Sequence, residues 1–571
     1  MFGSLGPKEV NMAHVSSKPW LAHYDPGVPA EVDIPPIPLW RFLEDSAQRY
    51  PKNVALEFLG KTLSYAELWD LARRFAGGLK ELGVKPGDRV AIMLPNSPQF
   101  VVAFYGTLLA GGVGVNVNPL YTPRELRHQL ADAGAETLVI LDHLLPRFLE
   151  VQGETPVKRT VVTGIKDFLP FPKNLLYPLK AKKDKLPLGF PKKEGFFAFT
   201  NLLKHAPATP HASDPEDLAL LQYTGGTTGI SKGAMLTHRN LVANVLQIDA
   251  WDPTSKDLLG KGVMLGALPF FHVYGMTVAM NYGLFSGYKL ILLPRPEIHA
   301  IVEAIEKHQV THFPGVPTLY VAFNNFPGIE KRNVKSIRIC LSGAAPLPVE
   351  VAKRFEEITG ARLIEGYGLS EASPVTHSNP VLGEVKKGSI GMPFPSVEAK
   401  VVDEEGNEVP LGEVGELIVQ GPNVMKGYWN RPEETQKALK DGWLFTGDMA
   451  RMDQDGYFYI VDRKKDMIIA GGYNIYPREV EEVLYQHQAV QEAAVVGVPD
   501  PYRGETVAAF IVLKDEFKGK VSEKDLEAFC RQNLAAYKVP RIIQFRDTLP
   551  KSSVGKILRR ELREEFAKKH P

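Results

Sequence analysis

The sequence has few cysteines, no excess of charge of either sign, and a single long stretch without charged residues. Among 571 residues there are two cysteines, Cys340 and Cys530, far apart in the chain. They give no basis for a disulfide framework, and a reducing cytosol is the simplest compartment. Lys and Arg number 67 against 66 Asp and Glu, so no overall field draws the protein to nucleic acid or anionic lipid.

The uncharged stretch runs over residues 262–288 and is long enough to span a bilayer. It contains Pro269, His272, Asn281 and several glycines, which favour a strand, a turn and a buried helix over a membrane span. The N-terminus also lacks the apolar segment that a signal peptide needs. We therefore expect a cytoplasmic protein.

Residues 166–204 mix lysines with large apolar and aromatic side chains. The lysines include Lys173, Lys180, Lys182, Lys183, Lys185, Lys192 and Lys193, and the apolar residues include Phe168, Phe171, Leu175, Tyr177 and Phe190. Two interpretations stay open for this segment. It is either a solvated surface insertion, or an interfacial patch whose aromatics and lysines contact anionic lipid. The second interpretation would place the protein peripherally on the inner face of the cell membrane.

Strand and helix patterns alternate through the first half of the chain. Ser64 and Glu67 form a capping-box signature before a helical apolar repeat. Residues 89–94 read as a buried strand, a helix is expected over 98–110, and a further strand begins at Val113. Such alternation predicts an α/β fold with parallel sheets, and a chain of this length needs at least two domains.

The pattern changes near Asp462. Beyond it we expect a helix over 477–484, β-rich segments over 493–498 and 506–513, a helix capped by Ser522, and a last strand over 541–546. The predicted organisation is a large multi-sheet N-terminal domain, residues 1–461, and a small mobile α+β C-terminal domain, residues 462–571.

Glycines, threonines and one lysine follow the apolar strand predicted over 218–222. The segment from Tyr223 to Gly233 reads YTGGTTGISKG. Glycines let backbone N–H groups approach phosphate oxygens, and the hydroxyls and the ammonium complement their charge. Ser231 precedes Lys232 and Gly233 follows it, so the segment is not a Walker A loop.

This segment resembles the phosphate loop of the adenylate-forming (AMP-binding) superfamily, which includes acyl-CoA synthetases, peptide-synthetase adenylation domains and firefly luciferase. Ser231 stands where the family usually has proline. Four further segments match family motifs in the family's order: EGYGLSE at 365–371, WLFTGD at 443–448, DRKKD at 462–466 and LPKSSVGK at 549–556. The resemblance covers nearly the whole chain.

The resemblance implies an enzyme that uses ATP and Mg²⁺ to activate a carboxylic acid. Tyr367 would stack on adenine, and Asp448 and Arg463 would bind the ribose, while Lys465 would be the hinge. The implied metal residues are Glu371 and Thr224, and the implied catalytic residues are Lys556, His272 and Lys232. The implied ATP- and AMP-binding residues are Thr224, Gly225, Gly226, Thr227, Thr228, Gly229, Lys232, Glu365, Gly366, Tyr367, Gly368, Ser370, Glu371, Asp448, Ile460, Arg463 and Lys556.

The expected acyl acceptor is the thiol of coenzyme A, because no carrier domain follows Lys556. Gly471, Gly472 and Tyr473 lie in a segment that resembles the one lining the family's pantetheine tunnel, so they are the expected CoA-binding residues. Transfer to a separate carrier protein stays open.

Two segments resemble those that line the family's acyl pocket. The expected pocket residues are Phe271, His272, Val273, Tyr274, Met276, Gly315, Val316, Pro317, Gly343 and Ala344. No aspartate that would hold an amino-acid ammonium is evident around residues 270–274. The sequences of four segments are similar to those of bacterial long-chain fatty-acid–CoA ligases: residues 170–178, 271–275, 370–374 and 461–466.

We therefore expect an ATP-dependent long-chain fatty acid–CoA ligase that forms acyl-CoA, AMP and pyrophosphate through an acyl-adenylate. Alternatives are a medium-chain or aryl acid–CoA ligase, an adenylating enzyme serving a separate carrier protein, and a non-catalytic lipid-binding relative. The expected partners are small molecules (fatty acid, ATP and CoA), not nucleic acid, and the family resemblance suggests a homodimer.

Overall fold

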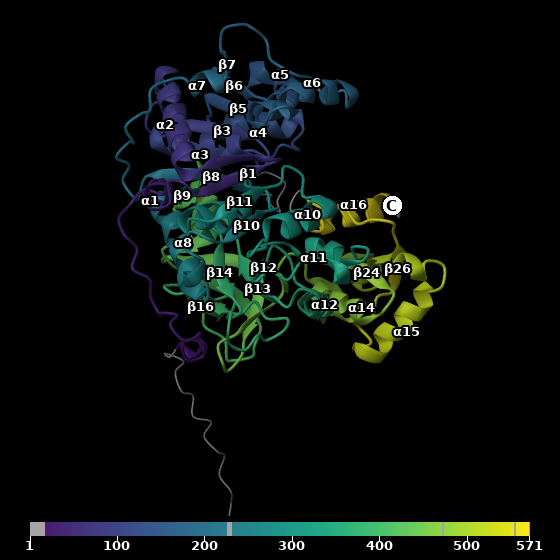
Figure 1. The fold of residues 1–571 in the computed structure, drawn as a ribbon. Coiled ribbons are helices and arrows are strands. Elements are labelled where there is room, and N and C mark those ends of the chain that lie inside the picture. Colours follow the sequence, from purple (N-terminus) through teal and green to yellow (C-terminus); the bar gives the residue numbers. More distant parts are fainter. Residues whose placement is uncertain (1–17, 225–230, 471–472, 553–554, 570–571) are drawn as a thin grey trace, which may run out of the picture.

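Figure 1 shows the computed structural model of the protein, which describes residues 18–224, 231–470, 473–552 and 555–569. The predicted nucleotide-binding residues Gly225, Gly226, Thr227, Thr228 and Gly229, and the predicted CoA-binding residues Gly471 and Gly472, lie outside the described residues. The side chain of Tyr473 is not described either.

An eight-stranded sheet carries the start of the predicted phosphate loop. Its order is β18-β9-β8-β4-β3-β5-β6-β7, with β3 to β8 parallel and β9 antiparallel to both β8 and β18. The strands are β3 Arg89–Met93, β4 Val113–Asn116, β5 Thr137–Leu141, β6 Arg159–Thr163, β7 Phe196–Ala198, β8 Leu218–Thr224, β9 Lys232–Thr237 and β18 Gly427–Tyr428.

Three smaller sheets complete the part of the chain before residue 464. The first contains β10 Val263–Gly266, β11 Lys289–Leu292, β1 Val54–Phe58 and β2 Lys61–Ser64. The second contains β12 Ile339–Ser342, β13 Arg362–Gly368, β14 Val375–Ser378 and β15 Met392–Pro393. The third contains β16 Glu398–Val402, β17 Gly415–Gln420, β20 Trp443–Met452, β19 Leu439–Lys440 and β21 Phe458–Arg463.

Helices lie between these strands and pack on the sheets (Figure 1). They are α1 Arg41–Arg49, α2 Tyr65–Glu81, α3 Pro98–Leu109, α4 Pro123–Ala133, α5 Leu145–Leu149, α6 Lys173–Lys183, α7 Phe199–Leu202, α8 His238–Trp251, α9 Tyr282–Phe285, α10 Ile298–His308, α11 Pro317–Asn324, α12 Val349–Thr359 and α13 Pro432–Ala438. The predicted capping box is confirmed, since Ser64 and Glu67 bond reciprocally at the start of α2.

The last sheet is built from residues after 467. It contains β22 Ile468–Ala470, β23 Tyr473–Ile475, β24 Val490–Asp500, β25 Gly504–Leu513 and β26 Ile542–Phe545, and the accompanying helices are α14 Pro477–Gln486, α15 Glu523–Asn533 and α16 Arg559–Lys569. Val495 and Val507 belong to a core with α14 and α15, whereas Val496 and Ala508 belong to a core with α16. Alternate strand residues thus bury both faces of this sheet.

The α/β class, with a large multi-sheet N-terminal part and a small α+β C-terminal part, is confirmed. The domain boundary at residues 461 and 462 stays a prediction, and it falls inside β21. The uncharged stretch 262–288 forms β10, a π-helical turn Gly275–Asn281 and α9. Among the described residues, no helix combines the length and apolarity that a bilayer span requires.

Candidate active site

One cavity collects ten of the predicted site residues from both parts of the chain. They are Pro317, Ala344, Glu365, Gly366, Tyr367, Gly368, Asp448, Ile460, Arg463 and Lys556. They come from the start of α11, from strand β13, from β20 and β21, and from the loop before α16. Segments that are far apart in the sequence therefore meet at one concave surface, which is the usual form of a small-molecule site.

Tyr367, Asp448 and Arg463 form a hydrogen-bonded group in the cavity wall. The Tyr367 hydroxyl donates to Asp448 Oδ2 at 2.6 Å, and Arg463 Nε lies 3.3 Å from Asp448 Oδ1. Burial and the nearby Asp448 charge raise the pKa of Tyr367 well above its usual range, so its hydroxyl remains a donor. Both carboxylate oxygens of Asp448 are thereby held in position.

Lys556 extends toward this group from the C-terminal loop. Burial and, after it, the Arg463 charge lower the pKa of Lys556 to about 7, while Asp448 opposes the shift. An ammonium held in such a position is poorly compensated by the protein itself. It is suited to an anionic ligand that would supply the missing negative charge.

Gly555 brings the Lys556 loop against the N-terminus of α11. Its φ is +75°, and a Cβ at this position would lie 2.5 Å from Thr318 Oγ1 and 3.3 Å from Val316 Cγ2. The left-handed backbone and the close approach both require glycine. Ser552 N donates to Lys556 O, and Gly555 N donates to Ser552 O.

Lys232 and Glu371 lie on either side of Tyr428. The Lys232 ammonium is 4.4 Å from the centroid of the Tyr428 ring, and the Tyr428 hydroxyl donates to Glu371 Oε1 at 2.7 Å. Thr224 pairs with Lys232 in the β8–β9 register. The short helical turn Ser370–Ala372 packs against β8 and β9, which places Ser370 and Glu371 beside the ends of the predicted phosphate loop.

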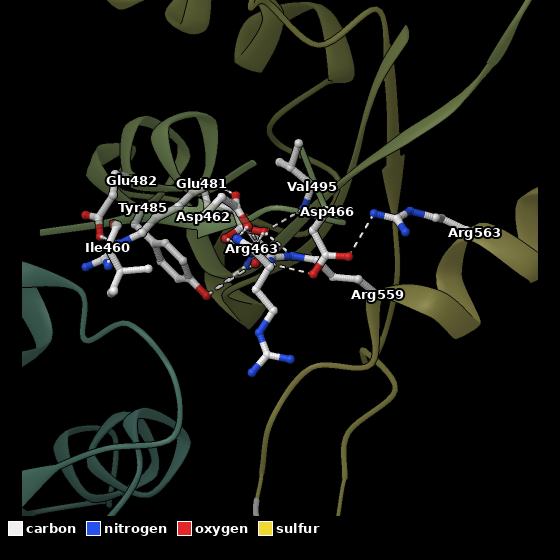
Figure 2. A network of polar contacts seen from close by, with 12 residues as sticks. Ile460, Asp462, Arg463, Asp466, Glu481, Glu482, Tyr485, Val495, Arg559 and Arg563 are labelled. Atoms are coloured by element: carbon white, nitrogen blue, oxygen red, sulfur yellow. Dashed lines mark hydrogen bonds and ion pairs between the residues drawn. The ribbon is translucent and has the colours of Figure 1, made fainter. Parts of the chain in front are cut away.

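Figure 2 shows a network of charged residues that connects the predicted hinge to the Lys556 loop. Arg559 donates to both Glu481 carboxylate oxygens, at 2.7 Å (Oε2) and 2.9 Å (Oε1), and to Asp462 Oδ1 at 3.4 Å. Arg563 donates to Asp466 Oδ1 at 3.0 Å. Lys465 lies between these two aspartates, in the turn that joins β21 to β22.

Glu365 contacts the C-terminal sheet domain and not only the cavity. Its carboxylate lies 3.6 Å from Arg478 of α14, and both side chains are buried. Burial raises the pKa of Glu365 to about 7, which Arg478 partly offsets. Arg478 also donates to Ile460 O at 2.9 Å and to Gly388 O at 3.3 Å. Arg478 thus connects α14 to β13 through Glu365, to β21 through Ile460, and to the loop that contains Gly388.

His272 is a neutral imidazole close to Lys556. Burial and the Lys556 charge lower the pKa of His272 to about 4. Its Nδ1 accepts a hydrogen bond from the Tyr274 N–H at 3.3 Å, so its proton resides on Nε2. The side chain can therefore donate one hydrogen bond to a carboxylate.

Three of the other predicted acyl-pocket residues are packed inside the protein, and the pocket stays a prediction. Val273, Tyr274 and Met276 are buried. The Tyr274 hydroxyl donates to Leu341 O at 2.7 Å, and a Cβ on Gly343 would lie 3.1 Å from the Tyr274 ring. Met276 Sδ instead faces Asn116, whose amide lies 3.4 Å away.

A second, strongly apolar cavity lies between α8, the π-helical turn and the β12–β14 sheet. Its lining residues include Ile248, Trp251, Met264, Val278, Leu341, Ile364 and Phe394. None of the predicted acyl-pocket residues lines it. Leu341 of β12 lines this cavity, and its carbonyl accepts a hydrogen bond from the Tyr274 hydroxyl, so Tyr274 is in contact with a residue of the cavity wall.

Sequence reasoning did not identify Tyr428, Arg478 and Arg559. Tyr428 follows Gly427 in a two-residue strand, which gives no pattern. Arg478 occupies the first turn of a helix, where it looks solvated. Arg559 and Arg560 are neighbours in a basic tail, yet only Arg559 turns inward to acidic partners. Their contacts come from tertiary packing, which the sequence pattern does not encode.

These elements together define a nucleotide-binding α/β enzyme with an added C-terminal domain. Comparison with known proteins gives the family. Residues 43–429 match the family described as AMP-binding enzyme, and residues 479–556 match the AMP-binding enzyme C-terminal domain. The chain belongs to the AMP-binding enzyme family.

Curated relatives and solved structures match over almost the whole chain. A long-chain-fatty-acid–CoA ligase of Bacillus subtilis is 51% identical, covering 97% of this chain and 99% of that protein. One from Escherichia coli is 43% identical, with 96% and 98% covered. ATP-bound MatB of Rhodopseudomonas palustris is 32% identical with a TM-score of 0.82, covering 93% and 99%. The anthranilate CoA ligase AuaEII with anthranoyl-AMP is 28% identical with a TM-score of 0.83, covering 94% and 99%.

Proposed function

We propose that the protein is an ATP-dependent ligase that joins a long-chain fatty acid to coenzyme A, with an acyl-adenylate as intermediate and AMP and pyrophosphate as products. The observation that carries the proposal is the shared cavity, where Tyr367, Asp448 and Arg463 meet Lys556. The near full-length similarity to two long-chain-fatty-acid–CoA ligases supports the choice of acid and thiol.

In the first half-reaction the fatty carboxylate attacks the α-phosphorus of ATP and pyrophosphate leaves. The carboxylate would accept a hydrogen bond from His272 Nε2, the proton position that the Tyr274 contact selects. The ammonium of Lys556, which the protein leaves undercompensated, would neutralise the developing charge. Asp448 would bind the ribose hydroxyls, and the face of Tyr367 would support adenine.

Mg²⁺ is proposed to bind with the ATP phosphates at Glu371. One oxygen of Glu371 is engaged by Tyr428, which leaves the second oxygen for a cation, and the Thr224 hydroxyl is a second hard donor. No cluster of three or more His, Cys, Asp or Glu suited to a metal occurs in the described ranges. Mg²⁺ held by phosphates needs only one or two carboxylates. The residues therefore fit, and the ion would supply charge neutralisation on the phosphates.

In the second half-reaction the CoA thiol attacks the mixed anhydride, the thioester forms and AMP leaves. We propose that the C-terminal domain rotates about Lys465 between the two steps, which withdraws Lys556 and brings the segment with Gly471, Gly472 and Tyr473 to the thiol. Lys465 lies in the turn between β21 and β22, a short connection suited to such a motion.

For the acid, we propose that the hydrocarbon end enters the apolar cavity beyond Leu341 when the Tyr274 ring moves aside. Most residues that line that cavity are aliphatic or aromatic, the others including Asp252, His312 and Ser378, and a mainly apolar cavity suits a hydrocarbon chain. Cytoplasm as the compartment remains a prediction from the cysteine content and the N-terminal sequence, and a homodimer as the assembly remains a prediction from the family resemblance.

A panel of straight-chain and aryl acids, each with ATP and CoA, tests the substrate class through AMP formation. We expect the highest kcat/KM for long straight chains. A maximum at medium-chain or aryl acids would reject the long-chain assignment and keep the ligase. Absence of AMP formation with any acid would favour the non-catalytic relative.

A further inference from the structure

Helix α6 and its flanks place large apolar side chains and lysines on the outside of the molecule. We propose that this region is a docking surface for an anionic lipid bilayer. The α6 surface is defined here as Phe171, Leu175, Leu176, Leu179 and Leu188 together with Lys173, Lys180, Lys182, Lys183, Lys185, Lys192 and Lys193. The inference is independent of the proposed reaction.

The apolar residues of the α6 surface are unusually exposed. Phe171 is 78% exposed, Leu175 67%, Leu176 56% and Leu179 68%. A surface helix normally turns its leucines toward the protein and its polar residues toward water. A contiguous group of exposed large apolar side chains marks a site of contact with another apolar phase.

The outward direction of these leucines follows from the residues that hold α6 to the protein. Ala181 is buried, and Tyr177, one turn earlier, packs against the main core, so these two mark the attached face. Leu179 is two residues from each of them, about 200° around the helix. Leu175 is likewise two residues from Tyr177. Leu175 and Leu179 thus lie opposite the attached face, where the rest of the described chain leaves them exposed.

The charge of the α6 surface is local and of one sign. Residues 171–194 contain seven lysines and two acidic residues, Asp184 and Glu194, a net charge of +5, whereas the whole chain carries +1. Within the described part of the chain, Lys180, Lys182, Lys183, Lys185 and Lys192 form no ion pair, and all five are exposed. Basic side chains around leucine and phenylalanine are the composition of a helix that lies in the headgroup region.

The position of α6 also suits a planar partner. In Figure 1, α6 lies at the upper right edge of the molecule, far from α15. The turn between β1 and β2 lies beside it, because Lys173 Nζ donates to Leu59 O at 2.8 Å. Leu59 and Lys61 of that turn are exposed. A projecting helix with a neighbouring turn can enter a bilayer surface, and docking there would leave the C-terminal domain unobstructed.

Charge complementarity selects an anionic bilayer among apolar partners. Each basic residue close to an anionic membrane strengthens attraction, and salt weakens it within a Debye length. Because five of these lysines form no ion pair among the described residues and the apolar side chains are exposed, a fluid surface of negative headgroups satisfies both without a matched protein shape.

Flotation of the full-length protein with lipid vesicles tests the proposal. We expect binding to phosphatidylcholine vesicles that contain phosphatidylglycerol, at least about tenfold weaker binding to phosphatidylcholine alone, and release at high salt. Leu175→Gln with Leu179→Gln should weaken binding by about tenfold or more, because two leucines no longer enter the apolar boundary. Lys182→Gln with Lys183→Gln should weaken binding by several-fold and reduce the salt dependence.

Matched controls separate the surface from general loss of apolar or basic residues. Leu382→Gln and Lys331→Gln replace exposed residues elsewhere and should bind vesicles like the parent protein. All variants should keep the parent melting temperature and the parent rate of pyrophosphate exchange with a short, soluble acid. Absence of vesicle binding by the parent, or equal binding by the leucine pair variant, would overturn the proposal. Equal binding to uncharged vesicles would overturn the requirement for anionic lipid.

Discussion

At Gly555, one added methyl group should slow the adenylation half-reaction and leave the thioester half-reaction nearly unchanged. In the structure the Lys556 loop touches the N-terminus of α11 through Gly555, and a Cβ there would lie 2.5 Å from Thr318 Oγ1. The backbone is also left-handed, with φ of +75°. Gly555→Ala should therefore move Lys556 out of the cavity, because both the contact and the backbone resist the alanine.

Two separable costs set the size of the effect. An alanine at positive φ costs about 1–2 kcal/mol, which corresponds to about tenfold. The overlap with Thr318 Oγ1 requires either that side chain or the loop to shift, and a displacement of the loop by about 1 Å at a reacting group can cost about 100-fold. We expect Gly555→Ala to lower the rate of adenylation by about 100-fold or more.

A double-mutant cycle with Thr318→Ala tests this reasoning. Thr318→Ala removes Oγ1, so adding Gly555→Ala to it should cost only about tenfold, the part due to backbone strain. Adenylation is measured as pyrophosphate release from ATP and acid, and thioester formation from supplied acyl-adenylate serves as the second assay. That second rate should change by less than about threefold. The same loss in both backgrounds, or in both half-reactions, would refute the role given to the contact.

Three further predictions concern the charge, the domain contact and the acyl chain. Since the pKa of Lys556 is lowered to about 7, its ammonium is lost as pH rises through that value. The adenylation kcat/KM for ATP should fall as the pH rises above about 7, and Lys556→Arg should remove this fall. An unchanged pH dependence in that variant would assign the fall to another group. Arg478→Met leaves Glu365 buried without its counter-charge, so the rate of adenylation should fall at least about tenfold. Adding Glu365→Gln should recover part of that rate, and no recovery would contradict the proposed ion pair between Arg478 and Glu365. Val278→Trp fills the apolar cavity and should shift the preferred acid to shorter chains in the AMP-formation panel. An unchanged chain-length preference would show that the acyl chain binds outside this cavity.

Local signals predicted much of the fold. Ser64 with Glu67, and the strand at 89–94, were readable because capping and buried apolar runs depend on nearby residues. The helix α6 was not evident, since Pro178 interrupts it and its leucines face outward instead of following a buried stripe. Its existence depends on the attachment of Tyr177 and Ala181 to the rest of the protein.

The motif residues were predicted, but their contacts were not. Tyr367 and Asp448 are 81 residues apart, and only the folded sheets bring them to 2.6 Å. Met276 is expected in the acyl pocket because it follows a matching segment, and this stays a prediction; in the structure it belongs to a π-helical turn and its Sδ lies 3.4 Å from the Asn116 amide. Backbone irregularity of this kind changes which face a side chain occupies, and short sequence patterns do not reveal it.

Acid-dependent exchange of labelled pyrophosphate into ATP, without coenzyme A, tests the central claim most directly. The account predicts exchange with a long-chain acid, and on addition of coenzyme A one AMP for each thioester formed, with exchange abolished by Lys556→Ala. Exchange that needs coenzyme A, or formation of ADP in place of AMP, would contradict activation through an acyl-adenylate.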